Sequence, residues 1–553
     1  MLRSKVVFKK LSCLLLASVI GLSTVSLMGC KKEQKTVKTF SAFIAVTGPS
    51  ENRESRLKKK IAEKLGAEVY VERLSGQTPE EKIQSMIAGG NYPDFIDGSG
   101  ATDLLIDANA LVPLDEYLDD YPILKNYLTD VQWESLRKED GHIYFIPPFG
   151  VINGHDTSTM PSGEAFWIQK RVLVWAGYPE VKTLDQYFDL IERYQEAEPM
   201  TNGEPTIGFE ILCDDWKYYC LENPPMFLAG YPNNGCAIVD PKTGKTGVYD
   251  TLPEAEQYYK KLNEVYNKGL IDRETFTLSY TQYIQRLSSG RVLGMVDQHW
   301  NIIDALSILH GNGMDDCAYV PLPITANENI EGNYLCTESN VNTASGIGIS
   351  VSCEDVQGAL SFLEGLLSPE VMILRNWGEK GVDYEVDEDG IFYRNEEETA
   401  NWARGDYIEE NSCPYSQFPA YEGMLADNKN AVNPIEQPDA FYAGLSEYDK
   451  KLMDAYGHKT WKEFLGEEKK GEAWFPLYSV TADWKSDTPY GKARDDMEKI
   501  KRRWLPLLIM AEDGSFDDMW AEYMKEYSET IDTKSYLDRL DMEVQKRIKA
   551  SAP

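Results

Sequence analysis

The 553-residue sequence predicts an α/β fold with doubly wound, parallel sheets, and three observations support this class. Strand and helix patterns alternate as β-α-β-α-β between residues 39 and 97, strand patterns return at 290–296 and 345–351, and the C-terminal stretch is helical. Such alternation is typical of a parallel sheet with helices on both faces. No low-complexity linker or internal repeat divides the chain, which favours domains joined by several crossings over domains joined by one tether.

The first elements follow from the spacing of apolar residues. Residues 39–46 are predicted to form a strand, and a polar loop at 47–52 leads into a helix over 57–65 whose apolar residues recur every four positions. Residues 67–74 form the second predicted strand.

A capping box then marks the start of the second helix. Thr78 and Glu81 occupy its two key positions, proline follows the threonine, and the helix ends at a Gly-Gly pair before a short strand at 94–97. Ligands of doubly wound sheets bind beyond the carboxyl ends of the strands. We therefore expect the loops at 47–52 and 97–102 to face a ligand.

The same patterns recur further along the chain. The strand at 345–351 leads into a helix with apolar residues at helical spacing. The other helices are predicted after a second capping box at 183–186, over 253–268, and in the C-terminal region at 516–524 and 536–548.

An uncharged stretch, 11–28, follows a basic N-terminus and precedes Cys30. Its length lies at the lower limit for a bilayer-spanning helix, and its layout is also that of a secretory signal. The tetrad LMGC at 27–30 resembles a bacterial lipobox with an unusually bulky second residue, which implies fatty acids on the Cys30 sulfur. We predict a signal peptide at 1–29 and a flexible tether at 30–38, with an uncleaved membrane anchor as the alternative.

Composition narrows the function classes. The net charge is −34, and removal of the four basic residues within 1–29 takes it to −38. This acidity argues against nucleic acid or anionic lipid as a partner. The hydrophobic fraction of 42% indicates a globular chain.

Seven cysteines follow Cys30, an odd number at irregular spacings. This pattern does not describe a disulfide framework. Buried free thiols are the preferred interpretation, with a Cys213–Cys220 disulfide as the alternative.

The acidic residues at 385–396 follow the outline of a calcium-binding loop. Glu385 is too long for the first position, and no clear helix leads into the loop. We therefore favour a hairpin turn at 387–390.

Five further stretches occur in a characteristic order: AGGNYPD at 88–94, ALVPLD at 110–115, DGHIYFIP at 140–147, FWIQKRVL at 166–173 followed by TLDQY at 183–187, and GEKGVDY at 378–384. Together with the lipobox they resemble the extracellular solute-binding lipoproteins of ABC-type carbohydrate importers, in the large branch typical of Gram-positive bacteria. The resemblance covers essentially the whole chain.

This resemblance implies a two-lobed fold, like that of periplasmic binding proteins, with a hinge and a central ligand cleft. We expect lobe 1 to contain 39–147 and 321–385, and lobe 2 to contain 148–320 and 386–553. The crossings between lobes are expected near the prolines at 146–148 and 319–323.

A sugar presents C–H faces and hydroxyl rims, so its site needs aromatic planes beside planar polar side chains. Trp300 is the strongest candidate, because the resemblance implies a stacking aromatic after a strand like 290–296; packing at the edge of a lobe is the alternative. Gln298 and His299 are its neighbours, and His299 lacks a second metal ligand at suitable spacing.

The remaining candidates are less specific. Trp167 is expected either in the cleft or as a core anchor, and Trp216 with Asp215 either binds sugar or begins a solvated helix. The other predicted ligand-binding residues are Asn153, His155, Asp156, Trp377 and Arg53.

The sequence contains none of the common short motifs of metalloproteases, α/β-hydrolases, disulfide oxidoreductases or P-loop ATPases. We predict a non-enzymatic, monomeric protein without cofactor or metal. It would be anchored at the outer face of the cytoplasmic membrane and pass a carbohydrate or other small solute to the transmembrane subunits of an ABC permease. The alternatives are a lipid-anchored glycoside hydrolase, a binding protein for a non-sugar solute such as a peptide, and a surface protein that senses or adheres.

Overall fold

The computed structural model describes residues 37–48, 54–413, 415–437, 440–482 and 484–551. The predicted signal peptide, Cys30 with most of the tether, and Arg53 lie outside the described residues.

The first sheet has five strands in the order β2-β1-β3-β14-β4. Their bounds are β1 (Lys38–Ile44), β2 (Ala67–Arg73), β3 (Phe95–Asp97), β4 (Phe145–Ile146) and β14 (Ile347–Ile349). The predicted β-α-β-α-β opening is confirmed, with α1 (Arg56–Leu65) and α2 (Pro79–Gly89) between parallel strands. The sheet is mixed, since β14 runs antiparallel to β3 and β4. The chain enters β14 on its return from the second sheet, so it runs against its neighbours.

The second sheet has four strands in the order β13-β6-β12-β9. Their bounds are β6 (Glu164–Gln169), β9 (Ile207–Glu210), β12 (Val292–Gln298) and β13 (Tyr319–Leu322). β12 is parallel to β9, whereas β6 is antiparallel to both β12 and β13. The carboxyl ends of β9, β12 and β13 therefore meet at one edge, together with the start of β6.

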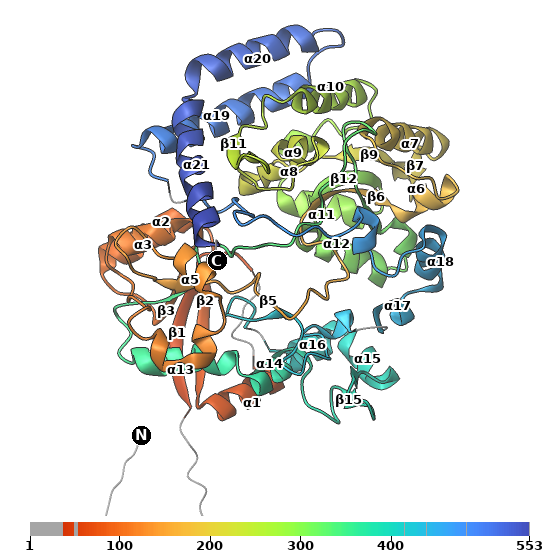
Figure 1. The fold of residues 1–553 in the computed structure, drawn as a ribbon. Coiled ribbons are helices and arrows are strands. Elements are labelled where there is room, and N and C mark those ends of the chain that lie inside the picture. Colours follow the sequence, from red (N-terminus) through yellow and green to blue (C-terminus); the bar gives the residue numbers. More distant parts are fainter. Residues whose placement is uncertain (1–36, 49–53, 414, 438–439, 483, 552–553) are drawn as a thin grey trace, which may run out of the picture. The chain divides into compact units, whose positions relative to one another are not determined.

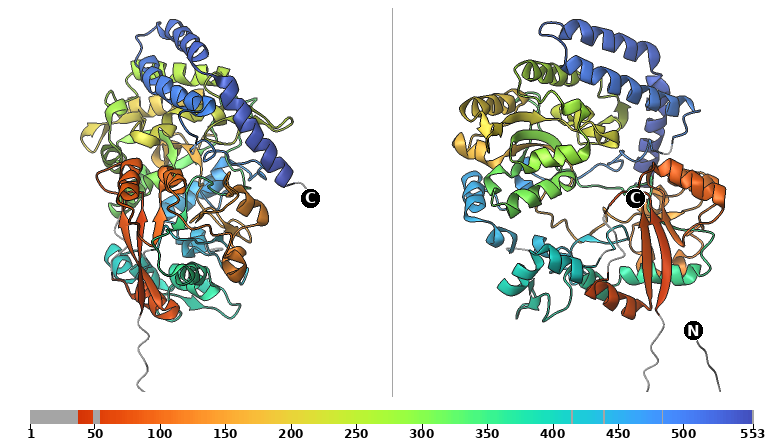
Figure 2. Two further views of the ribbon diagram at one scale, coloured as in Figure 1. Left: turned by 90° about the vertical axis from the view of Figure 1, so that its left-hand side faces the viewer. Right: turned by 180° about the vertical axis from the view of Figure 1, so that it is seen from behind.

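The two sheets lie in separate parts of the ribbon (Figures 1 and 2). Each sheet has its own hydrophobic core. In the first, Phe95 contacts the rings of Phe362, from α13 (Val356–Leu366), and of Phe418. The segment that contains Phe418, which the predicted boundaries assign to lobe 2, thus packs with the first sheet. The second sheet is buried on both faces, with Phe166 on one and Trp167 on the other.

Residues 147–163 connect β4 to β6, and residues 323–346 connect β13 to β14. These segments adjoin the predicted crossings at 146–148 and 319–323. β5 (Ile152–Asn153), in the first segment, pairs in parallel with β17 (Glu422–Gly423). The position of the hinge stays a prediction.

The helical C-terminal region is confirmed. α19 (Pro489–Ile509), α20 (Phe516–Thr530) and α21 (Thr533–Ala550) follow one another, and α19 and α20 lie against α10 (Pro253–Asn267) (Figure 1). Asn263 on α10 donates hydrogen bonds to the carbonyls of Ile509 and Ala511 at 3.0 and 2.8 Å. Both capping boxes are confirmed, at the start of α2 and of α7 (Leu184–Ala197).

The hairpin at 387–390 is also confirmed, because β15 (Glu385–Val386) pairs antiparallel with β16 (Phe392–Tyr393). The side chain of Asp387 accepts hydrogen bonds from the backbone of Asp389 and Ile391, and Gly390 supplies a φ of +82°.

All seven cysteines after Cys30 are described as free thiols. Among the described helices, none combines the length and apolarity that crossing a bilayer requires.

Gly294 permits close packing of α7 on β12, and it offers a test of the second core. A Cβ at this position would overlap the Tyr187 hydroxyl and lie 2.9 Å from Cδ1 of Ile191 and 3.1 Å from the carbonyl oxygen of Trp167. We predict that Gly294→Ala lowers the free energy of unfolding by about 1–3 kcal/mol through overpacking, measured by urea denaturation. Gly311→Ala, with no neighbour within 4 Å, is the control and should be neutral or slightly stabilising. Equal stability of the two variants would contradict this account.

Candidate functional site

Four of the predicted site residues come together at the edge of the second sheet. Asp215 and Trp216 lie in the short helix η3 (Asp215–Tyr218), in the segment after β9. Gln298 ends β12, and Trp300 lies in the first turn of α12 (His299–Gly311). Because β9 and β12 are parallel neighbours, both segments leave the sheet at the same edge, where ligands of α/β sheets bind.

The centre of this group is a pair of stacked indoles. The rings of Trp216 and Trp300 are 5.8 Å apart and inclined by 11°, and the two residues are 56% and 45% exposed. Tyr219 lies beside both, with centroid distances of 6.0 and 6.4 Å. The indole N–H of Trp300 donates to Oε1 of Gln298. Together they present an aromatic surface edged by an amide.

The buried carboxylate of Asp297 bonds residues next to this aromatic surface. It accepts hydrogen bonds from the hydroxyls of Tyr219 and Tyr283 at 3.2 and 2.8 Å and from Nδ2 of Asn301 at 3.0 Å. The backbone N–H of Gln298 adds a fourth donor at 2.7 Å. Burial raises the pKa of Asp297 to about 6 although these donors lower it.

Trp167 supports the same strand end from the core. It is fully buried, and its indole N–H donates to the carbonyl oxygen of Asp297 at 2.8 Å. The His299 ring lies 6.3 Å from it, and burial lowers the pKa of His299. Trp167 therefore lies beneath the aromatic surface, with no part of it exposed.

The loop after β9 is fixed by several contacts. Asp215 has a φ of +51°, and its carbonyl oxygen accepts a hydrogen bond from Arg502 at 2.8 Å. The ammonium group of Lys217 lies over the rings of Trp216 and Tyr280, at 4.5 and 4.6 Å from their centroids. Such contacts stabilise a cation by about 0.5–2 kcal/mol each and restrict the orientation of Trp216.

Three other predicted residues have partners of their own within the described part of the chain. Nδ2 of Asn153 donates to the carbonyl of Met424 at 2.7 Å. Asp156 is engaged by Lys462 at 2.5 Å; burial raises the pKa of Asp156, but its hydrogen bonds outweigh this and lower it overall. Trp377 is 1% exposed and donates its indole N–H to Ala431. None of the three has a described contact with Trp216 or Trp300.

Sequence reasoning missed Glu164, at the start of β6. It is 2% exposed and pairs in register with Gln298 across β6 and β12. Nδ2 of Asn223 donates to its Oε2 at 2.7 Å. Nδ2 of Asn233 donates to the same oxygen. Burial raises the pKa of Glu164 well above its usual range. The available signal was a carboxylate directly before the apolar run AFWI.

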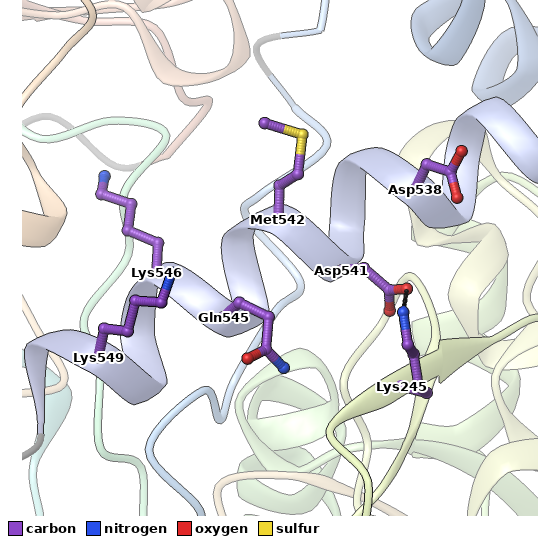
Figure 3. A pocket seen from close by; sticks show the side chains of 7 residues that line it. All are labelled: Lys245, Asp538, Asp541, Met542, Gln545, Lys546 and Lys549. Atoms are coloured by element: carbon purple, nitrogen blue, oxygen red, sulfur yellow. Dashed lines mark hydrogen bonds and ion pairs between the residues drawn. The ribbon is translucent and has the colours of Figure 1, made fainter.

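A separate hollow lies on the surface of α21 (Figure 3). Its lining residues are Lys245, Asp538, Asp541, Met542, Gln545, Lys546 and Lys549, and Lys245 pairs with Asp541 at 2.7 Å. It contains no aromatic ring and no predicted site residue. Within the described part of the chain, no group of three or more His, Cys, Asp or Glu could hold a metal ion.

The chain as a whole is similar to several known proteins. The model of the bacterial extracellular solute-binding protein family matches residues 56–377. The fructooligosaccharide ABC transporter substrate-binding protein FusA of Streptococcus pneumoniae serotype 4 is 24% identical over 369 residues. That alignment covers 64% of each chain, so it spans less than two thirds of FusA. The polygalacturonan/rhamnogalacturonan-binding protein YtcQ of Bacillus subtilis is 21% identical over 524 residues, covering 83% of this chain and 95% of YtcQ.

Solved structures show the same architecture. FusA from S. pneumoniae in complex with kestose superposes with a TM-score of 0.64 at 18% identity, covering 93% of this chain and 99% of FusA. The alginate-binding protein AlgQ2 superposes with a TM-score of 0.59 at 15% identity, covering 93% and 98% of the two chains. The predicted two-lobed α/β fold is confirmed by these similarities.

The pKa of Asp297 yields a test by pH. Folding raises this pKa from 3.8 to about 6, so the folded protein binds the proton more tightly than the unfolded chain does. The contribution to the free energy of unfolding is therefore full below about pH 4 and falls by about 3 kcal/mol as the pH rises past 6. We predict that Asp297→Asn removes this part of the pH dependence, whatever its effect on stability at one pH.

The measurement is urea unfolding of both proteins at several pH values between about 4 and 7. As the pH rises across this window, the free energy of unfolding of the variant should increase relative to that of the wild type. Parallel curves would show that Asp297 does not titrate as the buried network requires.

Proposed function

The chain belongs to the family of bacterial extracellular solute-binding proteins, and from this membership we propose that it captures a sugar or oligosaccharide outside the cell and delivers it to the permease of an ABC importer. The proposed role is binding and release of the solute without chemical change. FusA and YtcQ, which are named for carbohydrate binding, support a carbohydrate as the solute.

The observation that carries this proposal is the exposed indole pair at the carboxyl ends of β9 and β12. Two tryptophans that keep 56% and 45% of their surface exposed lose favourable burial unless a partner covers them. The C–H face of a sugar ring suits such a partner, while the amide of Gln298 and the carboxylate of Asp215 can bond its hydroxyls. Ligand sites combine apolar lining with a few oriented polar groups in this way.

The arrangement of two cores connected at 147–163 and 323–346 supports a closing motion. A solute that touches both lobes binds the closed form more tightly than the open form, so it shifts the population towards closure. We propose that the permease recognises the closed form. Bending would be confined to the connecting segments, since each sheet carries its own packed core.

Attachment to the membrane completes the proposal. Fatty acids on Cys30 would hold the protein at the outer face of the cytoplasmic membrane, and at least two chains are needed for stable anchoring. A tether at 30–38 would let the folded part reach the permease.

The stacking role of Trp300 can be tested by substitution. We predict that Trp300→Ala weakens binding of the best oligosaccharide at least tenfold, equivalent to about 1.4 kcal/mol. The reason is that the variant lacks the face on which the sugar packs. A thermal-shift screen finds the ligand, because ligand that binds only the folded state raises the melting temperature; titration calorimetry then measures the affinity.

Trp175, at the end of α6 (Lys170–Trp175), provides a matched control. It is also 45% exposed, and its described ring contact is with Tyr194 and not with Trp216 or Trp300. Trp175→Ala should keep wild-type affinity. An unchanged affinity in Trp300→Ala would remove the indole pair from the binding site.

The anchor is tested separately. Cys30→Ala should abolish incorporation of a labelled fatty acid and release the protein from the membrane fraction, because no sulfur remains to carry the lipid. Labelling of growing cells followed by fractionation measures both effects. Lys31→Ala is the control and should remain labelled; a labelled Cys30→Ala protein would overturn the assignment of the lipidation site.

A further inference from the structure

Lys217 lies beside the indole pair (Trp216 and Trp300) and contacts aromatic rings instead of a carboxylate. Its ammonium group is 4.5 Å from the centroid of the Trp216 ring and 4.6 Å from that of Tyr280. Within the described residues, no hydrogen bond or ion pair involves this ammonium group. The side chain is half-buried, and the attraction between a cation and a ring face strengthens when water is excluded. The two rings are therefore its main partners.

Tyr280 connects this lysine to both segments that carry the indole pair. It is the first residue of α11 (Tyr280–Ser288), which packs against α12 (Figure 1). Its backbone N–H, which the helix itself cannot satisfy, donates to Oδ2 of Asp214 at 2.8 Å. Its hydroxyl donates to the carbonyl oxygen of Asn301, in the first turn of α12, at 2.7 Å. One tyrosine thus bonds the segment after β9 and the segment after β12 at the same time.

The main chain beside Trp216 is fixed independently of Lys217. Arg502 on α19 donates to the carbonyl oxygen of Asp215 at 2.8 Å, and its guanidinium group lies 4.7 Å from the centroid of the Tyr218 ring. These contacts hold the backbone of η3. They do not include the Trp216 ring, so the orientation of that ring depends on other neighbours.

The Trp216 ring is more than half exposed, so packing in the core does not fix it. Its described ring contacts are with Trp300, Tyr219 and the ammonium group of Lys217. Of these contacts, the one with Lys217 is electrostatic, because the ring quadrupole attracts a cation. A side chain that is held in one orientation has already lost its rotamer freedom.

From these contacts we infer that Lys217 and Tyr280 are positioning residues of the proposed sugar site. They hold Trp216 stacked on Trp300 before a solute arrives, so the binding event does not have to order the indole. A site that is ordered in advance binds more tightly, because less entropy is lost on binding. The effect on affinity rests on the proposed function, whereas the effect on the indole pair is measurable without a ligand.

A direct hydrogen bond from Lys217 to the solute is the competing role, and it predicts a different pattern. A lysine that acts only through Trp216 loses its effect once the Trp216 ring is removed. A lysine that bonds the solute itself keeps its effect without that ring. A double-mutant cycle therefore separates the two roles, because it measures whether the two substitutions are coupled.

The first test uses the ligand-free full chain in detergent. Near-ultraviolet circular dichroism reports the fixed packing of aromatic side chains, and the difference between wild type and Trp216→Ala defines the signal of the stacked ring. We expect Lys217→Met to lose about half of this signal or more, and Lys217→Arg to keep it because a guanidinium also binds ring faces. A full signal in Lys217→Met would overturn the inference.

Lys459→Met is the matched control for this test. The ammonium group of Lys459 also lies over a ring, 3.8 Å from the centroid of Tyr442, and Tyr442 has no described contact with the indole pair. This variant should keep the wild-type signal. Loss of the same signal in Lys459→Met would overturn the assignment of the effect to Lys217.

The second test is titration calorimetry with the oligosaccharide that the thermal-shift screen selects. Lys217→Met and Tyr280→Leu, each confirmed as folded by its unfolding curve, should weaken binding by about threefold or more, and Lys217→Arg should stay within about twofold of wild type. In the Trp216→Ala background, Lys217→Met should cause little further loss. Wild-type affinity in either of the first two variants, or an equal loss from Lys217→Met in both backgrounds, would overturn the positioning role. If the wild type bound no carbohydrate, the proposed function would be overturned instead, and the spectral test would still decide the inference.

Discussion

The buried carboxylate of Asp297 bonds the residues that hold the proposed binding surface in place. It accepts hydrogen bonds from four donors at once: two tyrosine hydroxyls, an asparagine amide and a backbone N–H. One of these tyrosines, Tyr219, touches both exposed indoles, while the asparagine lies in the first turn of α12 beside Trp300. Burial of a carboxylate is unfavourable unless its oxygens are fully bonded. The network around Asp297 meets that condition, and in doing so it fixes the end of β12 against the segment after β9.

Side-chain hydrogen bonds connect each of the two connecting segments to neighbouring structure. In the first, Nδ2 of Asn153 donates to the carbonyl of Met424. In the second, Asn340 donates to the carbonyls of Ala473 and Phe475. Each segment is therefore fixed to structure beside it.

Local patterns in the sequence predicted most of the first sheet and its helices. The structure contains the predicted capping boxes at Thr78 and Thr183 and the predicted alternation at 39–97, because each depends on neighbours within a few residues. The antiparallel direction of β14 depends on the path taken by more than two hundred intervening residues, and no local pattern encodes it.

The residues of the candidate site could be predicted only in part. Gln298 and Trp300 were expected beside the strand predicted at 290–296, and the resemblance singled out Trp300. The strand before Asp215 and Trp216, β9, was not predicted, so their position next to Trp300 became apparent only in the structure. Trp167 and Trp377 have the same chemistry as Trp300 but are buried, because burial depends on what packs over a side chain. Gly150 and Glu422 come from segments far apart in the chain, so the hydrogen bond between them required the three-dimensional structure.

The C-terminal helix has a consequence for how the protein matures. Arg547, three residues from the end of α21, is buried and donates to the carbonyls of Trp474 and Pro476 at 2.9 and 2.6 Å. The first core is likewise incomplete until Phe362 and Phe418 arrive. Neither half can thus finish folding from the N-terminal portion alone, although chains often fold domain by domain during synthesis. Under the proposed export from the N-terminus, the chain would remain open to extracellular proteases until its last helix emerged, and the proposed anchor at Cys30 would already hold it at the membrane.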